Sequence, residues 1–193
     1  MVRSGGVIAY PTDSCYALGC RMGDKDAAAR IRRIRDVDKH HNMTLVCRDL
    51  SELAVYAKVD NATYRLLKAH TPGPYTFILP ATHKTPRHLR HAGKKTIGLR
   101  VPQHAIALAL LAALNEPLIS ATLYLDDAEL PPTDAWEIRD RLEHQVDLVI
   151  EGGGATVKPT TVVDLTAGSA VIVRDGLGAT KAFEPTRARL PGL

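Results

Sequence analysis

Three oxygen-bearing side chains in a row, Thr12-Asp13-Ser14, follow a short apolar run near the start of the chain. The run at 7–10 is bulky and partly β-branched, so it predicts a buried strand that ends at Pro11. The three polar residue types suit a helix cap or a turn. They also suit a ligand site, because α/β sheets bind ligands at strand ends. Residue types alone leave both interpretations open and favour the turn.

Hydroxyl and guanidinium groups recur at the ends of other predicted strands. Hydroxyls donate to phosphate oxygens, and arginine binds them in bidentate fashion. If these groups converge on one cleft, they suit a nucleotide or another phosphate compound. The residues concerned are Thr76, Arg100, Ser120, Thr122, Thr160, Thr161 and Arg174.

Several familiar kinds of site are not indicated. The sequence has no G-x-x-x-x-G-K-[ST] loop, and GLGA near the C-terminus is too short and too late for a dinucleotide fingerprint. The three cysteines lack a C-x-x-C spacing, so we expect neither a disulfide framework nor a metal site, and a reducing, cytoplasmic location. The pair His40-His41 is interpreted as part of a polar loop. No stretch predicts a membrane span or a secretion signal.

A basic run at 83–95, HKTPRHLRHAGKK, holds five lysines and arginines, three histidines and no acid. It is either a solvated surface loop or a contact for phosphate or RNA. The run has no aromatic residue, which argues against a platform for base stacking. The candidate RNA-binding residues are Lys84, Arg87, Arg90, Lys94 and Lys95.

Predicted strands and helices alternate along the chain of 193 residues. This indicates one α/β domain with a twisted, mixed, open sheet over 1–180, followed by a loose tail at 181–193. The last two strands are too close for a helical crossover, so antiparallel pairing is expected there. Helices are predicted at 26–34, 51–58, 61–70, 105–114 and 134–143, with Asp24, Ser51 and Thr133 as caps. Strands are predicted at 7–10, 43–47, 75–79, 96–101, 118–123, 146–150, 161–165 and 171–174.

Six blocks occur in a fixed order between residues 5 and 178. They are GGVIAYPTDSCYALGC, TPGPYTFIL, KTIGLRVP, LISATL, KPTTVVDLT and VIVRDGLG. Together they resemble the YrdC-like family, most closely its YciO branch. The resemblance implies a twisted α/β sheet around a basic cavity. It also implies a nucleotidyltransferase that combines L-threonine, bicarbonate and ATP, with magnesium, into threonylcarbamoyl-AMP and pyrophosphate for tRNA modification.

The resemblance also implies roles for particular residues. Arg35 would supply a catalytic cation. Thr12, Tyr16 and Thr76 would bind the threonine substrate. The nucleotide and its phosphates would contact Arg100, Ser120, Thr122, Thr160, Thr161 and Arg174.

Two motifs depart from the synthase pattern. A Lys-x-Arg pair aligns with Arg35-Asp36-Val37, and a Ser-x-Asn motif aligns with Ser120-Ala121-Thr122. Valine cannot hold a phosphate, and threonine has one hydroxyl where asparagine offers a carbonyl and two N–H donors. We therefore expect weak or altered synthase activity. The alternative is a non-catalytic paralogue that binds double-stranded RNA, tRNA or a nucleotide.

The family pattern also places a helix before the first block, which here begins at Gly5-Gly6. Without that helix, apolar sheet surface is exposed, and a homodimer is one way to cover it.

Overall fold

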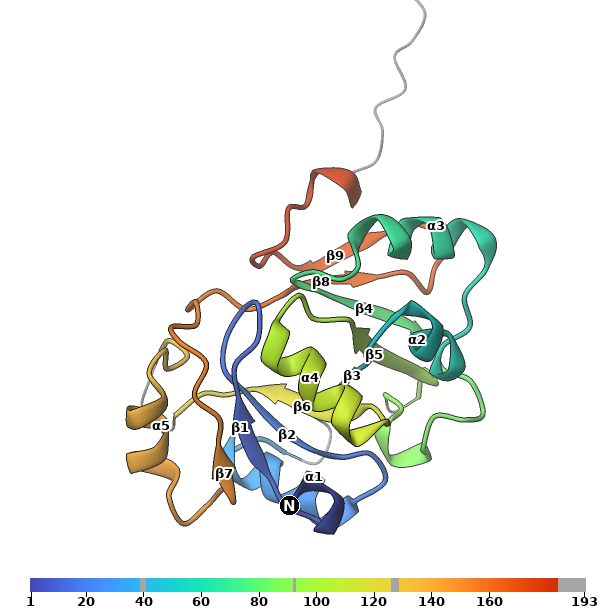
Figure 1. The fold of residues 1–193 in the computed structure, drawn as a ribbon. Coiled ribbons are helices and arrows are strands. Elements are labelled where there is room, and N and C mark those ends of the chain that lie inside the picture. Colours follow the sequence, from blue (N-terminus) through green and yellow to red (C-terminus); the bar gives the residue numbers. More distant parts are fainter. Residues whose placement is uncertain (39–40, 92, 126–128, 184–193) are drawn as a thin grey trace, which may run out of the picture.

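The computed structural model describes residues 1–38, 41–91, 93–125 and 129–183. They form a single α/β unit built on a nine-stranded sheet of order β7-β1-β2-β6-β3-β5-β4-β8-β9 (Figure 1). Parallel pairing joins β1 to β7, β3 to β5 and β4 to β8, and the other neighbours are antiparallel. The mixed sheet and the antiparallel β8–β9 pair are as predicted. The strands are β1 (Ile8–Tyr10), β2 (Ala17–Arg21), β3 (Thr44–Val46), β4 (Tyr75–Pro80), β5 (Thr96–Arg100), β6 (Leu118–Thr122), β7 (Leu148–Val149), β8 (Thr161–Asp164) and β9 (Val171–Arg174).

The helices begin at aspartate caps in four of five cases. Asp24 caps the first helix as predicted, and its side chain accepts a hydrogen bond from the Ala27 amide at 2.9 Å. Asp49 and Asp134 occupy the cap positions expected for Ser51 and Thr133. Each carboxylate lies three residues before an amide that it accepts, which is the spacing an N-cap requires. The α-helices are α1 (Lys25–Ile34), α2 (Leu50–Tyr56), α3 (Asn61–His70), α4 (Ala105–Leu114) and α5 (Ala135–Leu142), and short 3-10 turns lie at Val2–Ser4, Arg87–Leu89 and Lys181–Phe183.

Strand β2 was not predicted, although it lies near the middle of the sheet between β1 and β6. Its sequence, ALGCR, has small residues and no β-branched residue, so propensity gave no signal. Gly19 is needed there, because a Cβ at this position would lie 2.8 Å from the Tyr10 ring. The tyrosine is fully buried over this gap.

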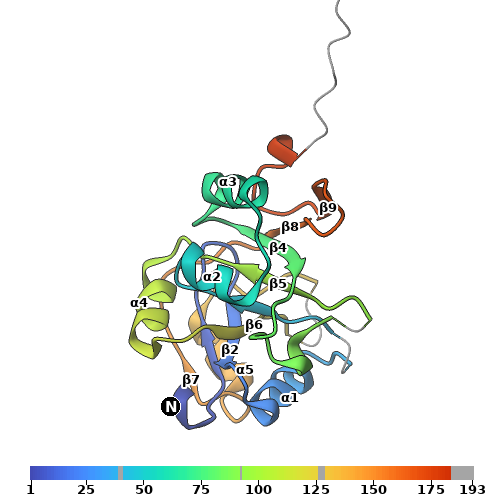
Figure 2. The ribbon, with the colours of Figure 1, turned by 90° about the vertical axis from the view of Figure 1, so that its right-hand side faces the viewer.

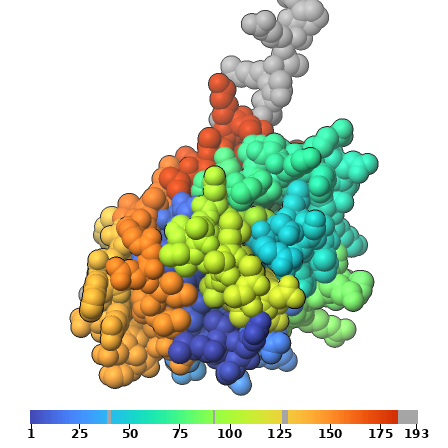
Figure 3. Space-filling view, in the orientation of Figure 1, coloured from blue at the N-terminus to red at the C-terminus, as the bar shows by residue number. Residues whose placement is uncertain are grey.

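One face of the central strands is apolar at one end. Val46 of β3 and Leu118 of β6 pack there against Ala107 and Leu111 of α4. Helix α4 covers this end, as its apolar sequence predicted, and its outer side remains at the surface of the molecule (Figure 3).

The same face is polar two residues away on each strand, at Thr44 of β3 and Ser120 of β6. Thr44 lies beside Ser120 on one side and beside Gly98 on the other. Side chains two residues apart on a strand share a face, so the polar positions form a floor next to the apolar end. This floor is where the cavity described below is found.

The larger core cluster contains the alternate residues of the same strands, such as Leu45 and Ile119, together with buried residues of α1, α2 and α3. In Figure 2, strands β2 and β6 lie between α4 and α1. Ile31 and Ile34 of α1 are buried in this cluster, as the helical pattern predicted.

The chain continues in contact with the domain beyond the predicted boundary at residue 180. Phe183 is 4% exposed, and its ring lies 4.6 Å from His70 and 5.6 Å from Tyr75 between ring centres. Aromatic packing therefore continues as far as residue 183. The remaining tail, 184–193, lies outside the described residues. None of the described helices combines the length and the apolar character that a bilayer-spanning segment needs.

Candidate functional site

A cavity of about 270 Å³ opens over the polar floor of the sheet. Its described lining includes three arginines, two histidines and several hydroxyls, and it contains no carboxylate. The cavity therefore favours anions. The polar lining residues are Ser14, Arg35, His41, Asn42, Thr44, Thr76, His91, Arg100, Ser120, Thr122, Tyr124, Thr160 and Arg174.

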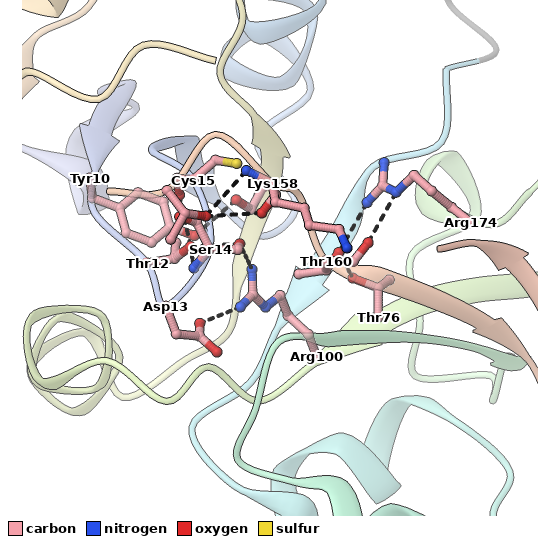
Figure 4. Close-up of polar contacts among 12 residues, drawn as sticks. Tyr10, Thr12, Asp13, Ser14, Cys15, Thr76, Arg100, Lys158, Thr160 and Arg174 are labelled. Carbon is pink, nitrogen blue, oxygen red and sulfur yellow. Dashed lines mark hydrogen bonds and ion pairs between the residues drawn. The ribbon is translucent and has the colours of Figure 1, made fainter. Parts of the chain in front are cut away.

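The Thr12-Asp13-Ser14 segment is both a turn and part of the site (Figure 4). The Thr12 hydroxyl accepts a hydrogen bond from the Ser14 amide at 3.1 Å and donates to the Cys15 carbonyl at 2.7 Å. Thr12 is buried and does not line the cavity in the described structure, whereas Ser14 does. Thr12 therefore shapes the loop that presents Ser14.

Arg100 of β5 reaches this loop from the sheet. Its guanidinium donates to the Asp13 carboxylate, and Nη1 donates to Ser14 Oγ at 3.4 Å. The side chains of Arg100 and Asp13 are 8% and 10% exposed. Arg100 Nε and Asp13 Oδ2 are buried and have no hydrogen-bond partner among the described residues. The ion pair fixes the guanidinium plane at the cavity wall.

A second cationic group lies on the other side of the cavity. Thr76 and Thr160 hydroxyls lie 2.9 Å apart, and Arg174 donates to the Thr160 hydroxyl and carbonyl, both at 3.0 Å (Figure 4). Register brings these residues together, because Val162 lies beside Thr76 on β4 and beside Arg174 on β9. All three predicted residues therefore meet in the cavity.

Arg35 follows the last turn of α1, and its side chain lines the cavity. The guanidinium carbon lies 4.9 Å from the centre of the Tyr124 ring, and Nη1 donates to the Thr122 carbonyl. Both contacts draw the side chain into the cavity, where a cation over a ring face is favourable. Burial lowers the pKa of Arg35, although an arginine remains charged at neutral pH.

The other predicted site residues divide into two groups. Ser120 lines the cavity, accepts from the Tyr10 hydroxyl at 2.8 Å and donates to the Leu18 carbonyl at 3.0 Å. Tyr16 and Thr161 lie outside the described lining. Tyr16 donates to the Gly153 carbonyl at 3.3 Å.

Thr161 anchors the segment that follows β9. Its hydroxyl donates to the Gly178 carbonyl at 2.5 Å and accepts from the Gly176 amide at 3.0 Å. This segment therefore packs against the backbone of Thr160.

The basic run lies beside β5. Lys84, Arg87, Lys94 and Lys95 are exposed. Arg90 differs, because its guanidinium donates to the Thr85 carbonyl at 2.7 Å and 3.0 Å, and so holds the loop.

The cavity residues that were missed from the sequence include Cys15, His41, His91 and Tyr124. Tyr124 lies two residues beyond the predicted Thr122, so strand alternation was an available signal. Burial raises the pKa of Cys15 to about 11, which keeps the thiol protonated at neutral pH. No group of three or more metal-ligating side chains occurs among the described residues.

Comparisons with known proteins agree with this geometry. A model of the Sua5/YciO/YrdC family, described as telomere recombination, matches residues 1–176. YciO from Escherichia coli is 56% identical over 183 residues, covering 95% of this chain and 89% of the relative. Its crystal structure matches with a TM-score of 0.90.

More distant relatives have a named activity. A threonylcarbamoyl-AMP synthase from Chromobacterium violaceum is 36% identical over 169 residues, covering 86% of each chain. P. abyssi Sua5 complexed with L-threonine has a TM-score of 0.82 at 28% identity, covering 91% of this chain and 52% of that one. The present chain thus spans about half of that larger protein. With the motifs, the fold and these matches in agreement, the chain belongs to the Sua5/YciO/YrdC family, as the sequence blocks indicated.

Proposed function

We propose that this protein binds ATP, L-threonine and bicarbonate in the cavity and forms threonylcarbamoyl-AMP with release of pyrophosphate. The observation that carries the proposal is the convergence of Arg35, Arg100 and Arg174 on one cavity without a facing carboxylate. A relative named threonylcarbamoyl-AMP synthase is 36% identical to this chain over 169 residues.

The proposed reaction follows from this charge pattern. The threonine amine forms an N–C bond with bicarbonate, a C–O bond breaks and water leaves, and an oxygen of the resulting carbamate attacks the α-phosphorus of ATP. An O–P bond forms, the bond between the α-phosphorus and the bridging oxygen breaks, and pyrophosphate leaves. Negative charge builds up on the phosphoryl oxygens, and fixed cations stabilise it without reorganising. Magnesium would arrive with the nucleotide, since Mg²⁺ commonly binds through substrate phosphates.

The two motif departures support a slow reaction. Thr122 lines the cavity with one hydroxyl, and Val37 lies in an adjoining cleft outside the cavity lining. Removing one stabilising contact of this kind lowers a rate by roughly 10²–10³.

Pyrophosphate release from ATP tests the proposal, with threonine and bicarbonate present together and then omitted in turn. We expect release that requires both. Arg174→Gln should lower the rate by roughly 10²-fold, whereas Arg33→Gln, on the exposed side of α1, should leave it unchanged. Release that is indifferent to threonine would reject the synthase proposal.

A second candidate function is RNA binding through the exposed lysines and arginines of the basic run. Its support is the exposure of Lys84, Arg87, Lys94 and Lys95. Binding through phosphates weakens steeply with salt, with a slope near −0.9 for each neutralised phosphate on a duplex. Structured RNA should bind at low salt, and replacing these four residues with glutamine should flatten the salt dependence. No binding by the unaltered protein at low salt would reject this candidate.

A further inference from the structure

His41 lies at the boundary between two spaces. It lines the cavity, and it also lines an adjoining cleft with Val37, Asp38 and Asn42. Val37 aligns with the second cation of the Lys-x-Arg pair, but it lines only the adjoining cleft. Among the described residues between Val37 and Asn42, His41 is therefore the ionisable side chain that lines the cavity.

The charges around His41 are mostly positive. Burial lowers the pKa of His41, and Arg35 and Arg32 of α1 lower it further, while Asp38 acts in the opposite direction. The imidazole is therefore largely neutral at neutral pH. An anion placed beside Arg35 would reverse this balance, because a nearby negative charge favours the protonated ring.

The other cavity histidine is less suited to this role. His91 Nδ1 lies 3.0 Å from the Thr96 hydroxyl, and its Nε2 is buried without a partner among the described residues. Burial lowers the pKa of His91, with Asp164 raising it and Lys94 lowering it. Because its Nε2 is buried, His91 is the competing candidate that the test must exclude.

We propose that His41 binds the phosphate groups of the ligand and takes up one proton from solvent as it does so. This inference rests on the proposed nucleotide site, and it assigns to His41 the contact that Val37 cannot make. It makes the protein contribute a pH-dependent gain in anion affinity as pH falls, whereas a site of arginines alone has no titration of its own across that range. The proton enters and leaves with the anion, so the site carries its extra charge only when occupied.

Binding of pyrophosphate, without added metal, tests the inference at pH 6.0 and pH 8.5. The ionisation of pyrophosphate itself is the same for every variant, so ratios of affinity between variants isolate the protein. We expect His41→Gln to bind pyrophosphate about tenfold more weakly than the unaltered protein at pH 6.0. At pH 8.5 the two proteins should bind it almost equally. A tenfold change in affinity corresponds to one charge contact of moderate strength. His41→Arg should bind tightly at both values, and His91→Gln should keep the unaltered pH dependence.

Each outcome is decisive. Equal affinity ratios for His41→Gln at both pH values overturn the inference, as does a pH dependence that disappears in His91→Gln or no binding by the unaltered protein at pH 6.0. Proton uptake measured by calorimetry in two buffers of different ionisation enthalpy should be lost in His41→Gln. A pH-dependent pyrophosphate site in a protein that releases no pyrophosphate from ATP would retain this inference and reject only the proposed synthase.

Discussion

The carboxylate of Asp13 holds the guanidinium of Arg100 across the gap between a loop and the sheet, and both side chains are about nine-tenths buried. A buried pair of this kind does two things. It neutralises a charge that could not otherwise be buried, and it fixes the arginine in one orientation. The turn made by Thr12 thus helps to position Arg100 at the cavity wall, because it holds the neighbouring residue Asp13.

We expect Asp13→Asn to lower the free energy of unfolding by about 3 kcal/mol, since it leaves the buried Arg100 without its counter-charge. Urea denaturation measures this change. Asp140→Asn, on the exposed side of α5, is the matched control and should stay within about 0.5 kcal/mol. Equal stability of the two variants would mean that solvent, and not Asp13, compensates Arg100.

The elements with strong local signals could be predicted from the sequence. Helices α3 and α4 have the boundaries that were predicted, 61–70 and 105–114. Strand β2 was missed because small residues give no β-propensity, and its place is decided by Tyr10 packing over Gly19. Short-range patterns contain no information of that kind.

The candidate site divides in the same way. Residues at strand ends, such as Thr160 and Arg174, were predicted because alternation and chemistry agree on them. The direction of Arg35 was not, because it depends on the Tyr124 ring, which lies far away in the sequence. The role of His41 likewise depends on which distant segments lie beside its loop. Long-range neighbours of that kind follow from sheet register, which the sequence does not display.

Gly176 lies where the C-terminal segment crosses the Thr160 loop. A Cβ there would lie 2.3 Å from the Thr160 carbonyl carbon and 2.4 Å from the Pro159 oxygen. Backbone atoms cannot give way as a flexible side chain can, so Gly176→Ala should destabilise the protein by about 1–3 kcal/mol. It should also weaken nucleotide binding, because it displaces Thr160. The control is Gly154→Ala, whose Cβ would meet nothing within 4 Å; a similar effect of both changes would contradict the packing argument.

Cys15 should react slowly with iodoacetamide in the folded protein at pH 8. Burial raises the pKa of the Cys15 thiol from 9.0 to about 11, although Arg100 and Arg174 oppose the shift. The thiolate is the nucleophile, so labelling should increase only as pH approaches 11. Peptide mass spectrometry measures it, with Cys20, raised to about 12, as the slower internal reference. Fast labelling of Cys15 at pH 7 in the folded protein would show that the cavity cations dominate over burial.

Val37→Arg combined with Thr122→Asn should raise pyrophosphate release, since it restores the arginine of one synthase motif and the asparagine of the other. Thr122 lines the cavity, so an asparagine there adds donors to the reacting groups. An arginine at position 37 starts from the cleft that His41 shares with the cavity, and it adds a long cationic side chain there. One recovered contact to a transferring phosphoryl group corresponds to roughly 10²-fold in rate. The two single variants separate the contributions, and Val37→Ala controls for the loss of the valine. No gain in either single variant or in the pair, with threonine, bicarbonate and ATP all present, would mean that the two departures do not limit the reaction.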